Sequence, residues 1–219
     1  MDKYRMLFSK TGRAVYISHL DLMRTVTRAF MRAECKLKYS EGFNPHPSIS
    51  IALPLSVGCE SVCEIMDFKM REDMTCEEIK SRLADQFPEG IEVIDVYEAG
   101  RKVKEIKWLR ISGVFEYDER DAAAMAEKLN EFYSADSIVI SKRTKKGKGE
   151  SDIRPAIMEI SFEQSGSDVL MLALISAQEP TLNPELIADA LRQLAPDIAP
   201  DFAKFRRLEI FDENMQVFR

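Results

Sequence analysis

Long apolar runs are missing from this sequence, and so is an apolar leader at its start. The longest apolar stretch runs from Val169 to Ile175, far short of the roughly 20 residues that a membrane-spanning helix needs. The first ten residues mix charged and apolar side chains, unlike a secretory signal peptide. We therefore expect a cytoplasmic protein that has no membrane partner.

Cysteine and histidine are also scarce. The 219 residues include four cysteines and two histidines. Zinc needs about four convergent ligands, commonly with a C-x2-C pair, and no such pair occurs here. Free thiols in a reducing compartment are the simpler interpretation, so we expect neither a metal site nor a cofactor. The cysteines are Cys35, Cys59, Cys63 and Cys76.

Several catalytic and nucleotide-binding motifs are absent as well. The sequence has no G-x-G-x-x-G after a strand, no G-x4-G-K-[ST] and no G-x-S-x-G, so motifs for nucleotide binding and for serine hydrolysis are missing. Cys59 and Cys63 are followed by Met66 where a C-x3-C-x2-C motif would place a third cysteine. The chain therefore lacks the cluster-binding motif of radical SAM enzymes.

Hydrophobic periodicity predicts two similar halves. With 45% hydrophobic and 31% charged residues the composition is that of a folded protein. Each half reads as strand, helix, strand, strand, helix, strand, which is the order of a ferredoxin-like sandwich. We predict an α+β fold of two ferredoxin-like (βαββαβ) sandwiches with antiparallel sheets, covering residues 1–100 and 101–219, the second with one extra strand.

The boundaries of these elements follow from alternation, caps and turns. Ser18 is expected to cap the first helix and Thr75 the second, and a short extended segment is expected at Ala14–Ile17. In the first half we predict strands at Tyr4–Phe8, Ser48–Leu53, Val62–Met70 and Ile91–Tyr97, and helices at Ser18–Cys35 and Thr75–Phe87. In the second we predict strands at Leu109–Tyr117, Ser137–Ser141, Ile157–Glu163, Val169–Ile175 and Phe205–Phe211, and helices at Glu119–Tyr133 and Asn183–Leu194.

Positive charge is concentrated near the N-terminus of an acidic chain. Residues 1–58 contain nine Lys and Arg against four acidic residues, whereas the whole chain has a net charge of −6. Arg24, Arg28 and Arg32 recur every four residues, on the helix side opposite Val26 and Phe30. This stripe is either an ordinary solvated face or a ridge that binds phosphate groups.

His19 stands in the first turn of the same predicted helix. The positive end of the helix dipole favours a neutral imidazole there. Either the residue only belongs to the helix start, or it accepts a proton or binds an anion at that end of the helix.

The stretch from Tyr39 to Pro47 is the most unusual in the chain. Pro47 pushes His46 out of the helical region, and Pro45 restricts its own backbone. An extended histidine in a stiff loop is a candidate hydrogen-bond donor or acid–base group, and Asn44 beside it is a candidate polar contact. Alternatively, the loop is a rigid connection and His46 only bonds a neighbouring carbonyl.

A second basic segment, residues 142–149, is expected to form a loop in the second half. Its cations and glycines suit contacts with a nucleic-acid backbone, although a solubilising loop fits equally well. Aromatic residues for base stacking are absent from it. The candidate anion-binding residues here are Lys145, Lys146, Lys148 and, further on, Arg154.

Several of these motifs together resemble the radical-SAM-associated (radical-SAM-linked) family of uncharacterised bacterial proteins. The resemblance is carried by Ile17–Arg24, Arg28-Ala29, Arg32-Ala33, Tyr39–Pro47, Ala52–Gly58, Ser61, Glu64, Asp67, Lys145–Gly147 and Asp152–Arg154. Members of this family occur alone or fused behind a radical SAM enzyme, often encoded near RNA-processing and ribosomal genes. The resemblance implies a companion role in RNA modification or processing.

We therefore expect a non-catalytic protein that binds RNA or presents it to a radical SAM enzyme. The alternative from the enzyme class is a metal-independent, ribonuclease-like protein that uses His46, with His19 as a partner. At the level of fold alone, two ferredoxin-like domains with a histidine also resemble the CRISPR repeat-processing endoribonucleases, which cut RNA without metal. A pure protein–protein adaptor is the third possibility.

Overall fold

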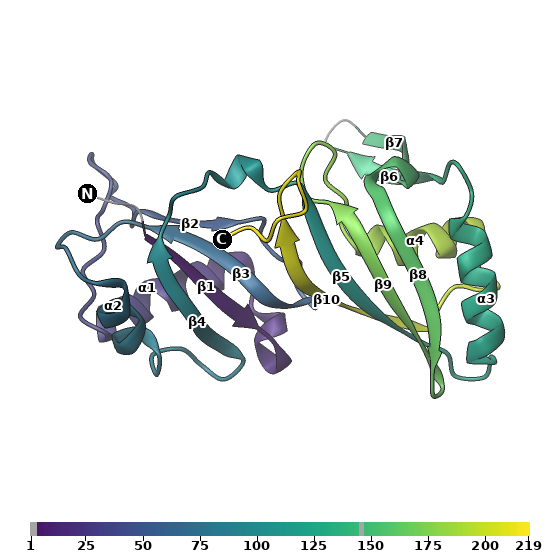
Figure 1. The fold of residues 1–219 in the computed structure, drawn as a ribbon, viewed down its shortest axis with the longest axis horizontal. Helices are drawn as coiled ribbons and strands as arrows, with labels where there is room; N and C mark the ends of the chain where they lie inside the picture. The colour runs from purple at the N-terminus through teal and green to yellow at the C-terminus, as the bar shows by residue number, and fades with distance from the viewer. Residues whose placement is uncertain (1–3, 145–146) are drawn as a thin grey trace. The chain divides into compact units, whose positions relative to one another are not determined.

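The computed structural model describes residues 4–144 and 147–219, and the chain divides into two units. The first comprises Met1–Glu105 with Phe218–Arg219, and the second comprises Ile106–Val217. Both combine helices with antiparallel strands, so the chain is a mixed α+β protein (Figure 1). None of the helices in the described residues is long and apolar enough to span a membrane.

The first unit pairs its strands in the order β4-β1-β3-β2, and every neighbouring pair is antiparallel. Both helices pack against one face of these strands, because they share one apolar core with them. At its centre the rings of Phe30 and Phe68 lie 4.9 Å apart, edge to face. The elements are β1 (Tyr4–Lys10), the 3₁₀ helix η1 (Gly12–Tyr16), α1 (His19–Arg32), β2 (Ile49–Ala52), β3 (Glu60–Phe68), α2 (Cys76–Leu83) and β4 (Ile91–Glu98).

The second unit repeats this arrangement with an insertion. Its strand order is β10-β5-β9-β8, again antiparallel throughout, and Phe115, Phe162 and Tyr133 pack at its centre. Between α3 and β8 a two-stranded ribbon is added. The elements are η2 (Val103–Glu105, still in the first unit), β5 (Trp108–Glu116), α3 (Ala122–Tyr133), β6 (Val139–Thr144), β7 (Gly147–Asp152), η3 (Arg154–Ala156), β8 (Ile157–Ser165), β9 (Asp168–Ser176), α4 (Glu185–Leu194) and β10 (Phe202–Phe211).

Two local predictions were wrong. Of the segment predicted to be extended, Ala14 to Tyr16 belong to the 3₁₀ helix η1 and Ile17 alone is extended, because Gly12 takes a positive φ of 55° and the chain then turns. The Ala14 amide donates to the Thr11 carbonyl at 3.1 Å, which closes the first turn.

The basic segment at residues 142–149 is not simply a loop. Residues 142–144 belong to β6 and residues 147–149 to β7, and these paired strands add two strands to the predicted order instead of one. The side-chain amide of Gln193 donates to the carbonyl of Ser141 at 3.2 Å and accepts from its amide at 2.9 Å. These two hydrogen bonds satisfy the backbone of Ser141 on the edge of β6 that does not pair with β7. The alternation of side chains in the sequence does not predict such a contact.

Candidate functional site

The first helix, α1, begins with a compact polar cap. The Ser18 hydroxyl accepts from the Asp21 amide at 3.2 Å and donates to the Asp21 carboxylate at 2.7 Å. The same carboxylate pairs with Arg24 at 2.9 Å. The hydrogen bond from Ser18, followed by that from Arg24, holds the pKa of Asp21 below its ordinary value. His19 is the first residue of the helix and its side chain is exposed.

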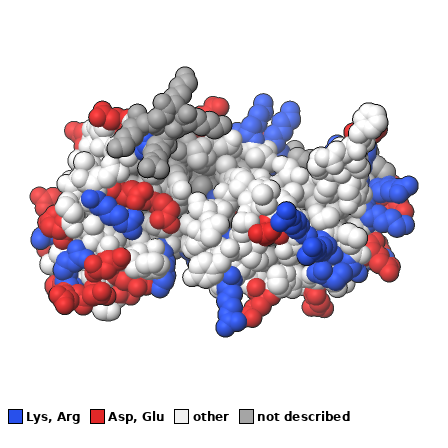
Figure 2. All heavy atoms as spheres, turned by 180° about the vertical axis from the view of Figure 1, so that it is seen from behind, with Lys and Arg blue, Asp and Glu red and all other residues white. Residues whose placement is uncertain are grey.

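The three arginines of α1 all lie on its exposed side, opposite the fully buried Val26 and Phe30. Arg24 is held by Asp21, and Arg32 donates to the backbone carbonyl of Gln86. Among the described residues, Arg28 has no hydrogen-bonding or ion-pairing partner. Seen from behind, basic side chains form a band over the helical side of the first unit (Figure 2). We call Arg24, Arg28 and Arg32 the arginine stripe.

The segment from Tyr39 to Pro47 forms a closed loop after α1. The Ser40 amide donates to the His46 carbonyl at 2.8 Å, and the His46 amide donates to the Ser40 hydroxyl at 3.0 Å. The backbone of His46 is therefore fixed while its imidazole stays exposed, as is Asn44. At the tip of the loop, Phe43 is completely exposed.

His46 also borders a pocket of about 390 Å³ that it shares with Ser40 and Asp67. Asp67 is buried and accepts two hydrogen bonds from Arg5, at 2.6 and 3.2 Å. Arg5 also donates to the Arg101 carbonyl at 2.8 Å, and it is fully buried. Its remaining nitrogen, Nη1, has no hydrogen-bond partner in the described residues. Asp67, which belongs to this buried ion pair, thus lines the same pocket as His46.

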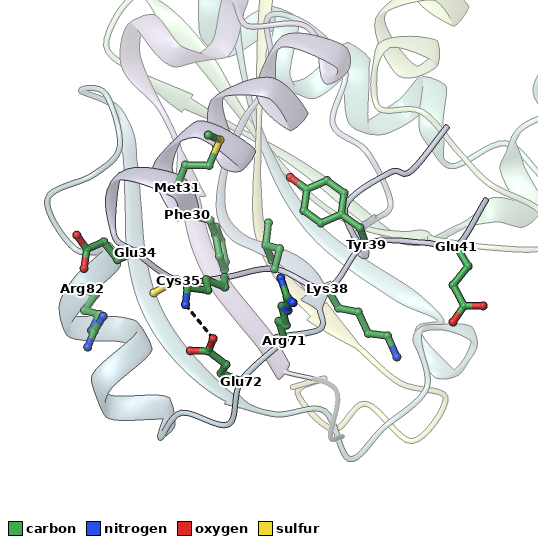
Figure 3. A pocket seen from close by; sticks show the side chains of 12 residues that line it. Phe30, Met31, Glu34, Cys35, Lys38, Tyr39, Glu41, Arg71, Glu72 and Arg82 are labelled. Carbon is green, nitrogen blue, oxygen red and sulfur yellow. Dashed lines mark hydrogen bonds and ion pairs between the residues drawn. The ribbon is translucent and has the colours of Figure 1, made fainter. Parts of the chain in front are cut away.

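A larger hollow of about 1100 Å³ lies at the C-terminal end of α1 (Figure 3). Its apolar lining comes from Phe30 and Met31 at the end of the helix and from Leu37 and Tyr39 in the following segment. The segment is fixed because the Lys38 amide donates to the Lys69 carbonyl at 2.8 Å. We call this space the α1 hollow.

The helix end beside this hollow has an unusual backbone. The Cys35 amide donates to the Phe30 carbonyl at 3.0 Å and the Glu34 amide donates to the Met31 carbonyl at 3.2 Å, which together form a Schellman motif. Glu34 takes the left-handed position of that motif with φ of 55°, where glycine is the usual residue. Glu34 is also one of the residues that line the hollow.

Charged residues surround the α1 hollow unevenly. Lys36 pairs with Glu72 at 2.9 Å and Arg82 pairs with Glu78 at 2.7 Å, so their charges are matched. The side chains of Lys38 and Arg71 form no hydrogen bond or ion pair in the described part of the chain. Burial raises the pKa of the Cys35 thiol, which keeps it neutral and argues against a role as a nucleophile.

The predicted residues of the second unit have different surroundings. The Arg154 side chain donates to the carbonyls of Ala135 at 3.1 Å and Ile157 at 2.6 Å, so it fastens the turn before β8. Lys145 and Lys146 lie outside the described residues. Lys148 belongs to β7 by its backbone, and its side chain also lies outside the described part.

The structure brings some predicted residues together and separates others. His46 and Asn44 share the loop after α1, whereas His19 lies at the other end of that helix, and no hydrogen bond in the described residues joins it to His46. Sequence reasoning did not identify the α1 hollow or the pairing of Arg5 with Asp67. Asp67 belonged to a recognised motif, and Tyr39 began the predicted loop, but nothing in their spacing indicated a shared cavity.

Comparisons with known proteins identify a family and a similar fold. A family described as "Uncharacterized protein conserved in bacteria (DUF2344)" matches residues 3–184. No curated protein matches the chain. A chain in the crystal structure of a Cbf5-Nop10-Gar1 complex is similar in fold, with a TM-score of 0.54, 11% identity, and coverage of 96% of this chain and 50% of that chain. The chain thus spans half the length of that solved protein.

A second solved structure, of an unknown protein from Galdieria sulphuraria, aligns with a TM-score of 0.29 and 10% identity. The alignment covers 94% of this chain and 98% of that one.

Proposed function

This chain belongs to the DUF2344 family of uncharacterised bacterial proteins, and we propose that it binds RNA through its first unit and presents it to a partner enzyme. The observation that carries the proposal is the arginine stripe: three guanidinium groups on one exposed helix face. Guanidinium groups bind phosphates through paired, forked hydrogen bonds. An RNA backbone offers phosphates repeatedly along such a face.

The surroundings of the stripe support RNA over a single small anion. Exposed cations continue beyond the helix at Lys38 and Arg71, and the neighbouring loop exposes Phe43 completely. Proteins that bind single-stranded nucleic acid commonly combine basic side chains with exposed aromatic rings. The total charge of −6 would repel RNA elsewhere, which favours binding at this one surface.

We further propose that each unit is a ferredoxin-like sandwich. The support is the shared strand order, β4-β1-β3-β2 in the first unit and β10-β5-β9-β8 in the second. In this interpretation the β6–β7 ribbon is an insertion into the second sandwich. For the partner, the motifs of the first half favour a radical SAM enzyme, to which this chain would bring its RNA.

A second candidate function is RNA cleavage without metal, with His46 as the acid–base group. It is favoured by one observation: His46 and Asp67 both line one pocket. The expected sign is RNA breakdown in the presence of a chelator that disappears in His46→Ala. Intact RNA after prolonged incubation with the wild-type protein would eliminate this candidate and leave the binding role.

The direct test of RNA binding uses labelled total cellular RNA at low and moderate salt. Arg24→Ala with Arg28→Ala should weaken binding at low salt by tenfold or more and lower the salt dependence by about two phosphate contacts. The matched control is Lys128→Ala with Arg192→Ala in the second unit, where Arg192 pairs with Asp189 as Arg24 pairs with Asp21.

Two results would contradict the proposal. One is the absence of binding by the wild-type protein at low salt. The other is equal loss of affinity in the α1 variant and in the control variant, because that would reduce the role of the stripe to general positive charge.

A further inference from the structure

We propose that the α1 hollow receives an unstacked base of single-stranded RNA, with Tyr39 as the stacking surface. This inference rests on the proposed function and adds a site that the arginine stripe alone does not provide. The hollow is about 1100 Å³, slightly larger than the roughly 300–1,000 Å³ typical of small-molecule sites. A nucleotide with part of its flanking backbone fits such a space.

Two exposed side chains supply the walls that a base requires. Tyr39 retains 44% of its surface exposed and Met31 retains 69%, although both are large and apolar. In Figure 3 the ring of Tyr39 extends over one side of the hollow, with Met31 and Phe30 on the other side. Every base has a flat face that stacks on an aromatic ring, and the methionine sulfur is polarisable and adapts to such a face.

The charges favour a base at the helix end and phosphates further away. The C-terminus of α1 carries partial negative charge, and the Glu34 carboxylate adds to it, so a phosphate would be repelled there. The amino and imino groups of a base can donate hydrogen bonds to carbonyl and carboxylate oxygens at this end of the helix. Lys38 and Arg71, which are not neutralised by an ion pair in the described residues, line the same hollow and suit the flanking phosphates.

The backbone at Glu34 gives independent support. A left-handed conformation is sterically unfavourable for a non-glycine residue, and φ of Glu34 is 55°. Glycine would satisfy the same Schellman motif without that cost. Backbone strain of this kind is concentrated at ligand-binding positions, and Glu34 is one of the residues that line the hollow.

The experiment compares a single-stranded RNA of mixed sequence with a duplex of the same length, both fluorescently labelled, on the full chain. Tyr39→Ala should weaken binding of the single strand about tenfold and leave duplex binding unchanged, because paired bases cannot enter the hollow. Tyr39→Phe is the matched control and should retain wild-type affinity, since the ring remains. Arg71→Gln should lower the salt dependence by about one phosphate contact.

The outcomes separate this inference from the function on which it rests. If Arg24→Ala with Arg28→Ala loses RNA affinity while a folded Tyr39→Ala binds the single strand as the wild type does, the inference is overturned and RNA binding by the stripe remains. A protein segment would then be the better candidate for the hollow. If the wild type binds neither RNA, both proposals fail. Should Tyr39→Ala unfold, Tyr39→Leu replaces it with the same expectation.

Discussion

The first helices of the two units occupy the same place in the element order but carry different surfaces. The exposed side of α1 bears Arg24, Arg28 and Arg32, whereas that of α3 bears Glu127, Lys128 and Glu131. Both helices bury an apolar face and begin with a side-chain cap, Ser18 in one and Asp121 in the other. This arrangement of strands and helices therefore forms without an arginine stripe. Because the fold does not require the stripe, we propose that it serves binding.

The interiors differ as well. On the central strands of the first unit, Arg5 lies directly opposite Asp67, and both are buried. On the corresponding strands of the second unit, the face away from the helices pairs Arg110 with Leu174 and Ser112 with Leu172. Among the described residues of β5 and β9, no pair on that face joins a guanidinium to a carboxylate, so the buried ion pair of the first unit is not needed to build such a sheet.

The largest expected effect comes from breaking that ion pair. Asp67→Ala should lower the free energy of unfolding by about 3–5 kcal/mol, because it leaves the Arg5 guanidinium charged and buried without its partner. Urea unfolding measures the change. The control is Asp95→Ala, which removes the exposed pair between Lys80 and Asp95 and should cost less than about 1 kcal/mol. Equal costs would show that the buried pair contributes no more to stability than an exposed one.

A smaller effect is expected at alkaline pH in the second unit. Its Tyr117 hydroxyl donates to the Ile198 carbonyl at 2.8 Å, and burial raises the pKa of Tyr117 to about 12; burial also raises the pKa of Tyr133. An unfolded tyrosine ionises at about pH 10. Between about pH 10 and about pH 12 the folded state therefore holds more protons than the unfolded one, and stability falls as pH rises.

Urea unfolding at several alkaline pH values tests this expectation. Below about pH 10 both phenols are protonated in the folded and the unfolded state, so they should not make the free energy of unfolding depend on pH there. Above about pH 10 the free energy of unfolding of Tyr117→Phe should fall less steeply with pH than that of the wild type. A loss of the same steepness in both proteins would remove Tyr117 as its cause.

The smallest effect concerns the ends of the two helices. After α1 the chain passes through Glu34 with φ of 55°, whereas α3 ends at Ser134 with φ of −75°. Glu34→Gly should stabilise the first unit by about 0.5–1 kcal/mol, because glycine adopts the left-handed conformation without steric cost. Glu34→Ala keeps the Cβ atom and should give no such gain, and a similar gain in both variants would place the strain elsewhere.

Much of the fold follows from local sequence signals. The caps at Ser18 and Thr75 and the alternation in β1 predicted elements that the structure contains, within a few residues of their observed bounds. The helix expected to reach Cys35 ends at Arg32, because the Schellman motif closes one turn earlier. The β7 strand was missed because Gly147–Asp152 has neither alternation nor β-branched residues, and backbone pairing with β6 stabilises it instead.

The candidate site was predictable only where it lies on one element. The arginine stripe follows from a spacing of four residues on a helix. The α1 hollow joins α1, the segment after it, the end of β3 and α2, so it depends on tertiary packing. Alternation likewise places Arg5 and Asp67 on the face opposite the helices, where charged residues ordinarily meet solvent, and their burial is a tertiary feature too.

The central claim is that RNA binds the first unit at α1 and the loop after it. Ultraviolet cross-linking of labelled RNA to the full chain, followed by mass spectrometry of the attached peptides, tests it most directly. The account predicts attachment within residues 19–47 and none within α3, at residues 122–133. Attachment confined to the second unit, with residues 19–47 free of RNA, would contradict it.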